Sequence, residues 1–205
     1  MLFYLFLVFQ IAALAAAIWY WDAYKNTTQR HFLWFLIYVV CNEIIGIAYQ
    51  HIFDHYNDIV HNIFILISFP FYFLWFYKIL QQRKWITQVL FVVFMMVFLY
   101  DLFDKSPIYN LYLNPMIVGA FCLLILTVSY FVELLNTDTI TTFIRSQKFW
   151  IVTGLFSFYI GLLPLLIFHR YLNYSGNFYT IVITVLNAVL YGCIFKSFLC
   201  LRKTK

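Results

Sequence analysis

Charged residues are scarce in this chain of 205 residues: only 10% are Asp, Glu, Lys or Arg, whereas soluble domains carry about 25%. Apolar residues make up 65% of the chain and aromatic residues 23%, against an apolar share of about 45–50% in soluble domains. No water-soluble fold can bury this much apolar surface. The composition therefore excludes a soluble globular protein and indicates an integral membrane protein.

Polar stretches long enough to form a soluble catalytic domain are missing as well. Seven apolar runs fill most of the chain, and about 20 apolar residues make a helix that crosses a bilayer. We therefore expect an all-α, polytopic fold with one seven-helix transmembrane domain over residues 1–205. The expected spans are 1–21, 33–53, 62–80, 86–103, 116–136, 149–168 and 180–200. The first run has no charged segment ahead of it, so we expect a first span rather than a cleaved signal peptide.

Motifs of metal and redox chemistry are also absent. The four cysteines have no CxxC spacing, and we expect them to be small buried side chains (Cys41, Cys122, Cys193 and Cys200). The sequence has no HExxH motif and does not gather several His, Asp or Glu residues at one membrane depth. We therefore expect no enzyme activity and no cofactor.

Basic residues exceed acidic ones by five, but they are scattered beside apolar runs rather than gathered on one face, so no nucleic-acid partner is expected. Cytoplasmic loops of membrane proteins are enriched in Lys and Arg. If the carboxyl terminus is cytoplasmic, eleven of the 13 basic residues lie on the inner side (Lys25, Arg30, Lys78, Arg83, Lys84, Arg145, Lys148, Lys196, Arg202, Lys203 and Lys205) and only Lys105 and Arg170 lie outside. This bias predicts an outer amino terminus, a cytoplasmic carboxyl terminus and a location in the cytoplasmic (inner) membrane.

A single acidic residue, Glu43, falls at the middle of a predicted span. A charged side chain at that depth costs about 2.5–3.5 kcal/mol on insertion scales, so it usually faces the bundle interior or a pathway. We predict an intramembrane polar site made of Glu43, Asn42, Gln10 and Asn187. Within it, Gln10 is expected to share a hydrogen bond with Glu43 or with Asn42. Two interpretations stay open: a binding or proton-relay group in a cavity, or a protonated carboxyl that fixes helix contacts.

The stripe that begins at Glu43 continues toward the outer surface. Gly46, Gln50 and Asp54 follow it at helical spacing and share its face. Beyond it, His51, His55 and His61 lie close together in the sequence with acidic neighbours. Histidines four residues apart on a helix can bind one divalent metal, so these three are a candidate metal site; the alternative is a set of hydrogen-bonding groups at the membrane surface.

Several other residues have predicted structural roles. Gly154, Ser157 and Gly161 form a stripe of small residues that predicts a close helix contact. Glu133 and Asp101 lie near the two membrane surfaces, where we expect capping or snorkelling. Residues 104–115 are expected to form a loop.

Three segments carry a resemblance to a known group: NEIIG at 42–46, HNIFILISFPFYFLWFYK at 61–78 and KFWIVTGLFSFYIG at 148–161. They resemble a loose group of bacterial seven-span proteins of about 200 residues, similar to the membrane regions that precede some two-component sensor histidine kinases. The resemblance implies a sensor-like membrane domain without its kinase.

The function expected from these features is that of a small sensor-like or accessory membrane protein. Its partners would be the lipid bilayer and either a cytoplasmic protein or further copies of the chain. The alternatives are an oligomeric channel or membrane-permeabilising effector, for example in a defence system, or a transporter. A cavity that reaches Glu43 from one side would favour binding, whereas polar faces around a central hole in an oligomer would favour a channel.

Overall fold

The computed structural model describes residues 3–53, 57–107, 110–136, 143–168 and 177–201. They form helices joined by short connections, with no strand in these ranges. The helices are α1 (Phe3–Trp19), α2 (Trp21–Tyr24), η1 (Thr28–Arg30), α3 (His31–Phe53), α4 (Asp58–Ile79), α5 (Lys84–Asp104), α6 (Leu113–Leu135), η2 (Phe143–Arg145), α7 (Gln147–Ile167) and α8 (Asn177–Leu199). The all-α prediction is confirmed, and each long helix begins and ends within four residues of a predicted span.

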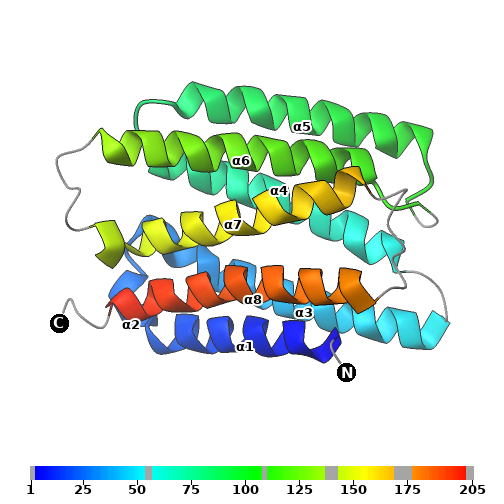
Figure 1. Cartoon of the computed structure of the whole chain (residues 1–205), viewed down its shortest axis with the longest axis horizontal. Coiled ribbons are helices and arrows are strands. Elements are labelled where there is room, and N and C mark those ends of the chain that lie inside the picture. The colour runs from blue at the N-terminus through cyan, green and yellow to red at the C-terminus, as the bar shows by residue number, and fades with distance from the viewer. Residues whose placement is uncertain (1–2, 54–56, 108–109, 137–142, 169–176, 202–205) are drawn as a thin grey trace.

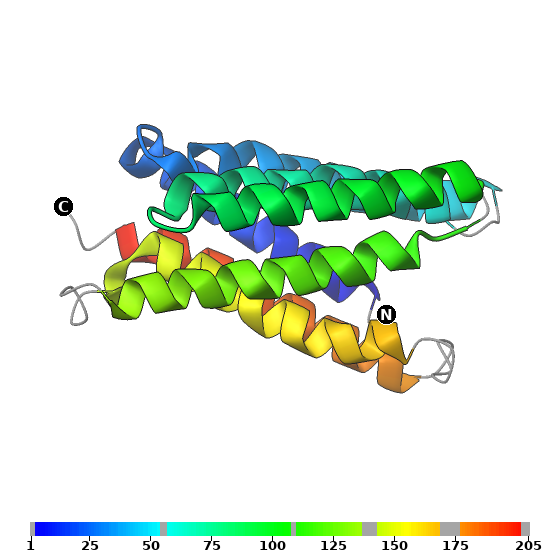
Figure 2. The same ribbon diagram turned by 90° about the horizontal axis from the view of Figure 1, so that it is seen from above.

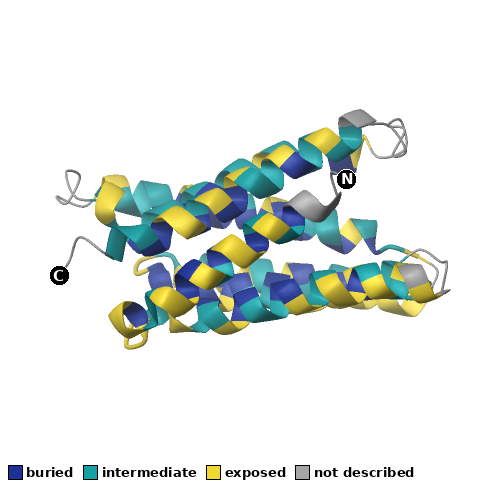
Figure 3. Ribbon diagram, turned by 90° about the horizontal axis from the view of Figure 1, so that it is seen from below, coloured by how far each residue is buried: buried dark blue, intermediate teal, exposed yellow. Residues whose placement is uncertain are grey.

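The described helices α3 to α8 are each long and apolar enough to cross a membrane, and α1 is a shorter apolar helix. The side chains that face outward on these helices are themselves apolar. On α5, for example, Val92, Met96 and Leu99 are all exposed, and exposed positions alternate with buried ones around the bundle (Figure 3). An apolar outer surface of this extent is stable in lipid and not in water. The chain is therefore a multi-pass integral membrane protein.

The long helices form a closed ring in which neighbours in the sequence are neighbours in space. From α3 to α8 each helix packs on the next, and α1 closes the ring by packing on both α8 and α3 (Figures 1 and 2). Helix α4 also reaches across to α6. Because every connection turns the chain back, α2, the α4–α5 turn and the carboxyl end lie at one end of the bundle, and the α3–α4 and α5–α6 connections lie at the other (Figure 1). We call these the basic end and the opposite end.

Small residues bring α7 against α8, as the sequence stripe predicts. A Cβ atom on Gly154 would lie 2.8 Å from the Cβ of Cys193 and 3.1 Å from the Leu190 carbonyl oxygen. A Cβ atom on Gly161 would overlap with Leu186 Cδ2. Larger residues at these two positions would push the helices apart, so the predicted close contact is confirmed.

Glu133, at the end of α6, binds the backbone of the α4–α5 turn. Its carboxylate accepts hydrogen bonds from the backbone N–H groups of Gln81, Gln82 and Arg83 at 2.9, 3.0 and 2.9 Å. All three N–H groups precede α5, so Glu133 fixes the turn that leads into this helix, and its charge lies near the amino-terminal end of the helix dipole. Capping or snorkelling was expected from the sequence; the structure shows instead that Glu133 binds the backbone of a neighbouring turn.

The sequence suggested that Asp101 snorkels to the membrane surface, and this prediction is wrong. Its side chain is fully buried and accepts hydrogen bonds from Lys105 Nζ and Asn114 Nδ2, both at 3.0 Å. Asn114 belongs to the first turn of α6, where Pro115 also lies, rather than to the predicted loop. Proline is tolerated there because the first helical N–H groups have no intrahelical partner.

Asn62 of α4 holds the same connection in place from the other side. Its Nδ2 donates to the carbonyls of Pro107 and Asn110 at 3.0 and 2.8 Å, and its Oδ1 accepts from the Tyr112 N–H at 2.9 Å. Buried polar groups need such partners to offset the loss of water. The polar residues at this end of the bundle thus fix α4, α5 and α6 relative to one another.

The cysteines differ in burial. Cys122 is buried, as expected, but Cys41 is exposed on the outward face of α3, contrary to expectation. The sequence signal failed there because a small apolar side chain is as compatible with lipid as with the protein interior.

Candidate functional site

A cavity of about 160 Å³ lies inside the ring of helices. Side chains from five helices line it: Gln10 of α1; Asn42, Glu43, Gly46, Ile47 and Gln50 of α3; Asn57, Val60, His61, Phe64 and Tyr72 at and within α4; Phe158 and Tyr159 of α7; and Asn187, Leu190 and Tyr191 of α8. All four residues predicted for an intramembrane polar site are among them. Gln10 and Asn187, which are 177 positions apart in the sequence, thus face one space.

Glu43 and Gln10 are hydrogen-bonded, as predicted. Gln10 Nε2 donates to Glu43 Oε2 at 3.5 Å, a long contact that holds the carboxylate loosely. Gln10 is only 4% exposed, and its Oε1 has no hydrogen-bond partner among the described residues. Glu43 also has no ion-pair partner within the described part of the chain. Glu43 therefore faces the cavity with one long hydrogen bond and, in the described structure, no ion pair, and beside it the Gln10 Oε1 acceptor is unpaired.

The polar stripe of α3 forms one wall. Gly46 and Gln50 follow Glu43 along the cavity, as their spacing predicts, and Asp54 lies outside the described residues. A Cβ atom on Gly46 would lie 3.2 Å from Asn57 Nδ2, so the absence of a side chain lets the start of α4 approach α3. Gln50 is exposed, so this wall extends from the bundle interior to its surface at the opposite end.

Of the three histidines in the candidate metal site, His61 is described completely. It lines the cavity and is exposed at its mouth. His55 and the side chain of His51 lie outside the described residues. In the ranges that are described, no three His, Cys, Asp or Glu side chains lie close enough to hold a metal ion. The metal site therefore stays a prediction.

Three tyrosines, Tyr72, Tyr159 and Tyr191, complete the inner part of the cavity, and the sequence prediction included none of them in the site. Tyr72 of α4, Tyr159 of α7 and Tyr191 of α8 line the same cavity as Glu43. Each side chain is at most 7% exposed. Tyrosine in membrane proteins concentrates at the interfaces, so its position in the middle of a span was an available signal.

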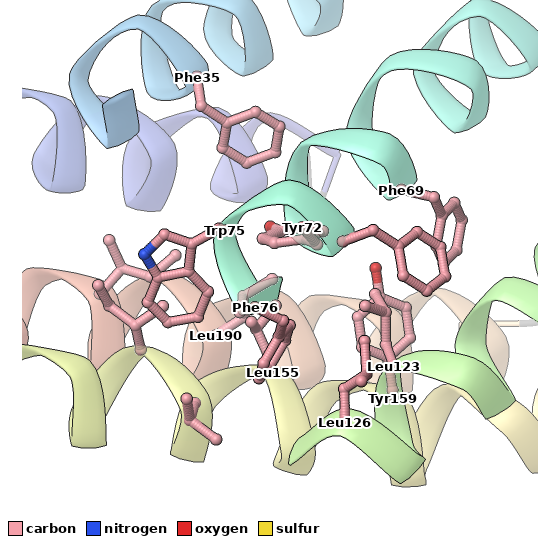
Figure 4. Packing of buried hydrophobic residues seen from close by; sticks show 14 of the residues in the cluster. Phe35, Phe69, Tyr72, Trp75, Phe76, Leu123, Leu126, Leu155, Tyr159 and Leu190 are labelled. Carbon is pink, nitrogen blue, oxygen red and sulfur yellow. The ribbon is translucent and has the colours of Figure 1, made fainter. Parts of the chain in front are cut away.

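Toward the basic end the cavity is closed by a layer of packed side chains. One helical turn beyond Tyr72, Tyr159 and Tyr191 lie Phe76 on α4, Leu155 on α7 and Ile194 on α8, and all three are fully buried. Figure 4 shows Tyr72, Tyr159, Phe76 and Leu155 in one packed cluster. The cavity is therefore blind: it has a mouth beside Gln50 and His61 and a closed floor near the middle of the bundle.

The chemistry available in this cavity is that of binding. The wall has one carboxyl group, side-chain amides, tyrosine hydroxyls and aromatic rings, arranged around a space with the exposed Gln50 and His61 at its mouth. A small cavity with a few convergent polar groups among apolar ones is the usual form of a ligand site.

Comparisons of the chain with protein-family models, with curated proteins and with solved structures give no match. The class of protein is therefore defined by the fold and the cavity alone: a helical multi-pass membrane protein with a polar, blind cavity inside its bundle.

Proposed function

We propose that this chain is a seven-span, sensor-like or accessory protein of the cytoplasmic (inner) membrane that binds a small molecule from the outer side. Binding would be communicated to a cytoplasmic or membrane partner at the basic end. The observation that carries the proposal is the blind cavity that reaches Glu43 from one side of the bundle. A sensor-like role is also what the sequence resemblance implies, that is, the resemblance to bacterial seven-span proteins similar to the membrane regions of sensor kinases.

The distribution of charge supports the proposed orientation. Lys25, Arg30, Arg83 and Lys84 lie at the basic end, between α2 and α3 or at the start of α5, whereas Asp101 and Asp104 lie near the other end of α5, at the opposite end of the bundle. A basic end in the cytoplasm follows the positive-inside rule and makes the mouth of the cavity face outward. As a seventh span, α1 has 17 residues, which at about 1.5 Å per residue give about 25 Å, near the lower limit for crossing the bilayer core.

The position of the polar residues argues against a pore between copies of the chain. They line the inside of a single bundle, whereas the outward face of α5 is apolar. A transporter is the better second candidate, because two helices that line the cavity have internal prolines, Pro70 in α4 and Pro164 in α7. Proline breaks the helical hydrogen-bond pattern and gives a point at which a helix can bend.

Thiol labelling tests the proposal. In a variant whose four cysteines are replaced by Ala, single cysteines are introduced at Gln50 in the mouth, at Asn187 in the wall and at Ser197, which is fully buried beyond the floor. A membrane-impermeant thiosulfonate reagent is then applied to intact cells and to inverted vesicles. We expect cysteine at positions 50 and 187 to react from the outer side only, and cysteine at 197 to be protected from both sides. Reaction at 187 from both sides would favour the transporter, and reaction only from the cytoplasmic side would refute the proposal.

A further inference from the structure

Among the described residues that line the cavity, Glu43 contributes a carboxyl group and there is no Lys or Arg; His61, at the mouth, is the one basic side chain. None of the ion pairs among the described residues includes Glu43. A partly buried carboxylate without a counter-charge is costly, so a cation placed beside it would be strongly favoured.

Gln10 adds an independent feature that points to a ligand. Its side chain is 4% exposed and lines the cavity, and its Oε1 is a buried acceptor without a hydrogen-bond partner in the described structure. Leaving a buried acceptor unpaired lowers stability, whereas a donor brought by a ligand would satisfy it. Glu43 and Gln10 are hydrogen-bonded to each other, so one N–H group or one cationic centre can interact with both.

The other walls of the cavity are aromatic. Tyr72, Tyr159, Tyr191, Phe64 and Phe158 surround the space from α4, α7 and α8. The face of an aromatic ring attracts organic cations, and cages of such rings bind quaternary ammonium groups. A hydrated metal ion gains little from phenyl rings, so these walls favour an organic cation over an inorganic one.

The size of the cavity limits the ligand. Its volume of about 160 Å³ is close to that of a protein cavity of about 150 Å³ that holds one benzene molecule. A ligand of about five to eight non-hydrogen atoms fits. Larger amines would have to extend through the mouth beside Gln50 and His61.

From these four observations we propose that the cavity binds a small organic cation of the alkylammonium class. The positive centre lies between Glu43 and Gln10, and the alkyl groups pack against the aromatic walls. This inference rests on the proposed binding function and deepens it by naming the class of ligand.

Calorimetric titration of the purified full chain in lipid nanodiscs tests the inference. The probes are methylammonium, tetramethylammonium, choline and 3,3-dimethyl-1-butanol, which has the shape of choline without its charge. We expect at least one of the three ammonium probes to bind at least tenfold more tightly than the neutral alcohol. Glu43→Gln should abolish that preference, whereas Asp104→Asn, which removes an exposed acid outside the cavity, should leave it unchanged.

A second variant keeps the test valid if Glu43→Gln fails to fold. Phe158→Leu leaves the carboxylate in place and removes one aromatic ring from the wall, so it should weaken ammonium binding roughly threefold to thirtyfold and affect the neutral alcohol less. The inference is overturned if no ammonium probe binds the folded wild-type chain, if the neutral alcohol binds as tightly as choline, or if a folded Glu43→Gln variant retains the preference. If one of these results is obtained while cysteine at position 187 is still labelled from the outer side, the proposed binding function stands and only the assignment of the ligand class is refuted.

Discussion

Replacing Glu133 by Ala removes the only side chain that binds the three backbone N–H groups of the α4–α5 turn in the described structure. A single capping residue contributes about 0.5–2 kcal/mol, and a hydrogen bond to a charged group about 1.5–3 kcal/mol when it is shielded from water. Two of these three hydrogen bonds are exposed to solvent, which weakens them, so their combined contribution to stability is much smaller than three times the value for a shielded hydrogen bond. We expect a loss of about 2 kcal/mol, which for a chain of this length corresponds to a fall in Tm of about 4–8 °C.

Thermal unfolding of the purified protein, followed by the fluorescence of its tryptophans, measures this change. Glu133→Gln is the informative intermediate. Its carbonyl oxygen can still accept from Gln82 and Arg83, while its NH2 group faces the Gln81 N–H, so about half of the loss is expected. The control is Asp22→Ala, which breaks an exposed ion pair with Lys25 and should change stability by less than about 1 kcal/mol. A Tm for Glu133→Ala equal to the Asp22→Ala value would refute the reasoning.

Two further predictions concern packing and pH. Gly119→Ala places a Cβ atom 2.5 Å from the ring of Phe69 and should destabilise the bundle by about 1–3 kcal/mol. Gly192→Ala meets no atom within 4 Å and should be neutral or stabilising. Chemical denaturation compares the two variants, and equal effects on the free energy of unfolding would contradict the packing described. Burial raises the pKa of Tyr24, whose hydroxyl donates to the Ala17 carbonyl at 2.8 Å. The folded state therefore holds this proton where the unfolded state releases it, so stability is retained below about pH 10 and falls above it. Tyr24→Phe should lose about 1 kcal/mol at neutral pH and show a shallower decline between pH 10 and 11; an unchanged slope would show that Tyr24 does not cause the decline.

The helices and their limits follow directly from the apolar runs, because in a bilayer every backbone group must be paired within its own segment. The pairing of Gln10 with Glu43 was predictable for the same reason: polar side chains at equal depth in adjacent spans have few other partners. The stripe of Gly154 and Gly161 likewise predicted its contact, although the identity of the neighbour, α8, required the structure.

The rest of the site could not be derived from single segments. Tyr72 and Tyr159 come from helices far apart in the sequence, and nothing in either segment shows that both face Glu43. Asp101 was misjudged because depth alone suggested an interface, whereas its burial depends on Asn114 and Lys105 folding over it. Such polar clusters are set by how loops close, which span prediction does not describe.

The closed ring has a consequence for how the protein is made. Of the described long helices α1 is synthesised first, yet one of its two principal neighbours, α8, is synthesised last. The face of α1 that packs on α8 must therefore stay without this partner until the helices between them have been made. The bundle closes only when α8 has been synthesised and packs on α1.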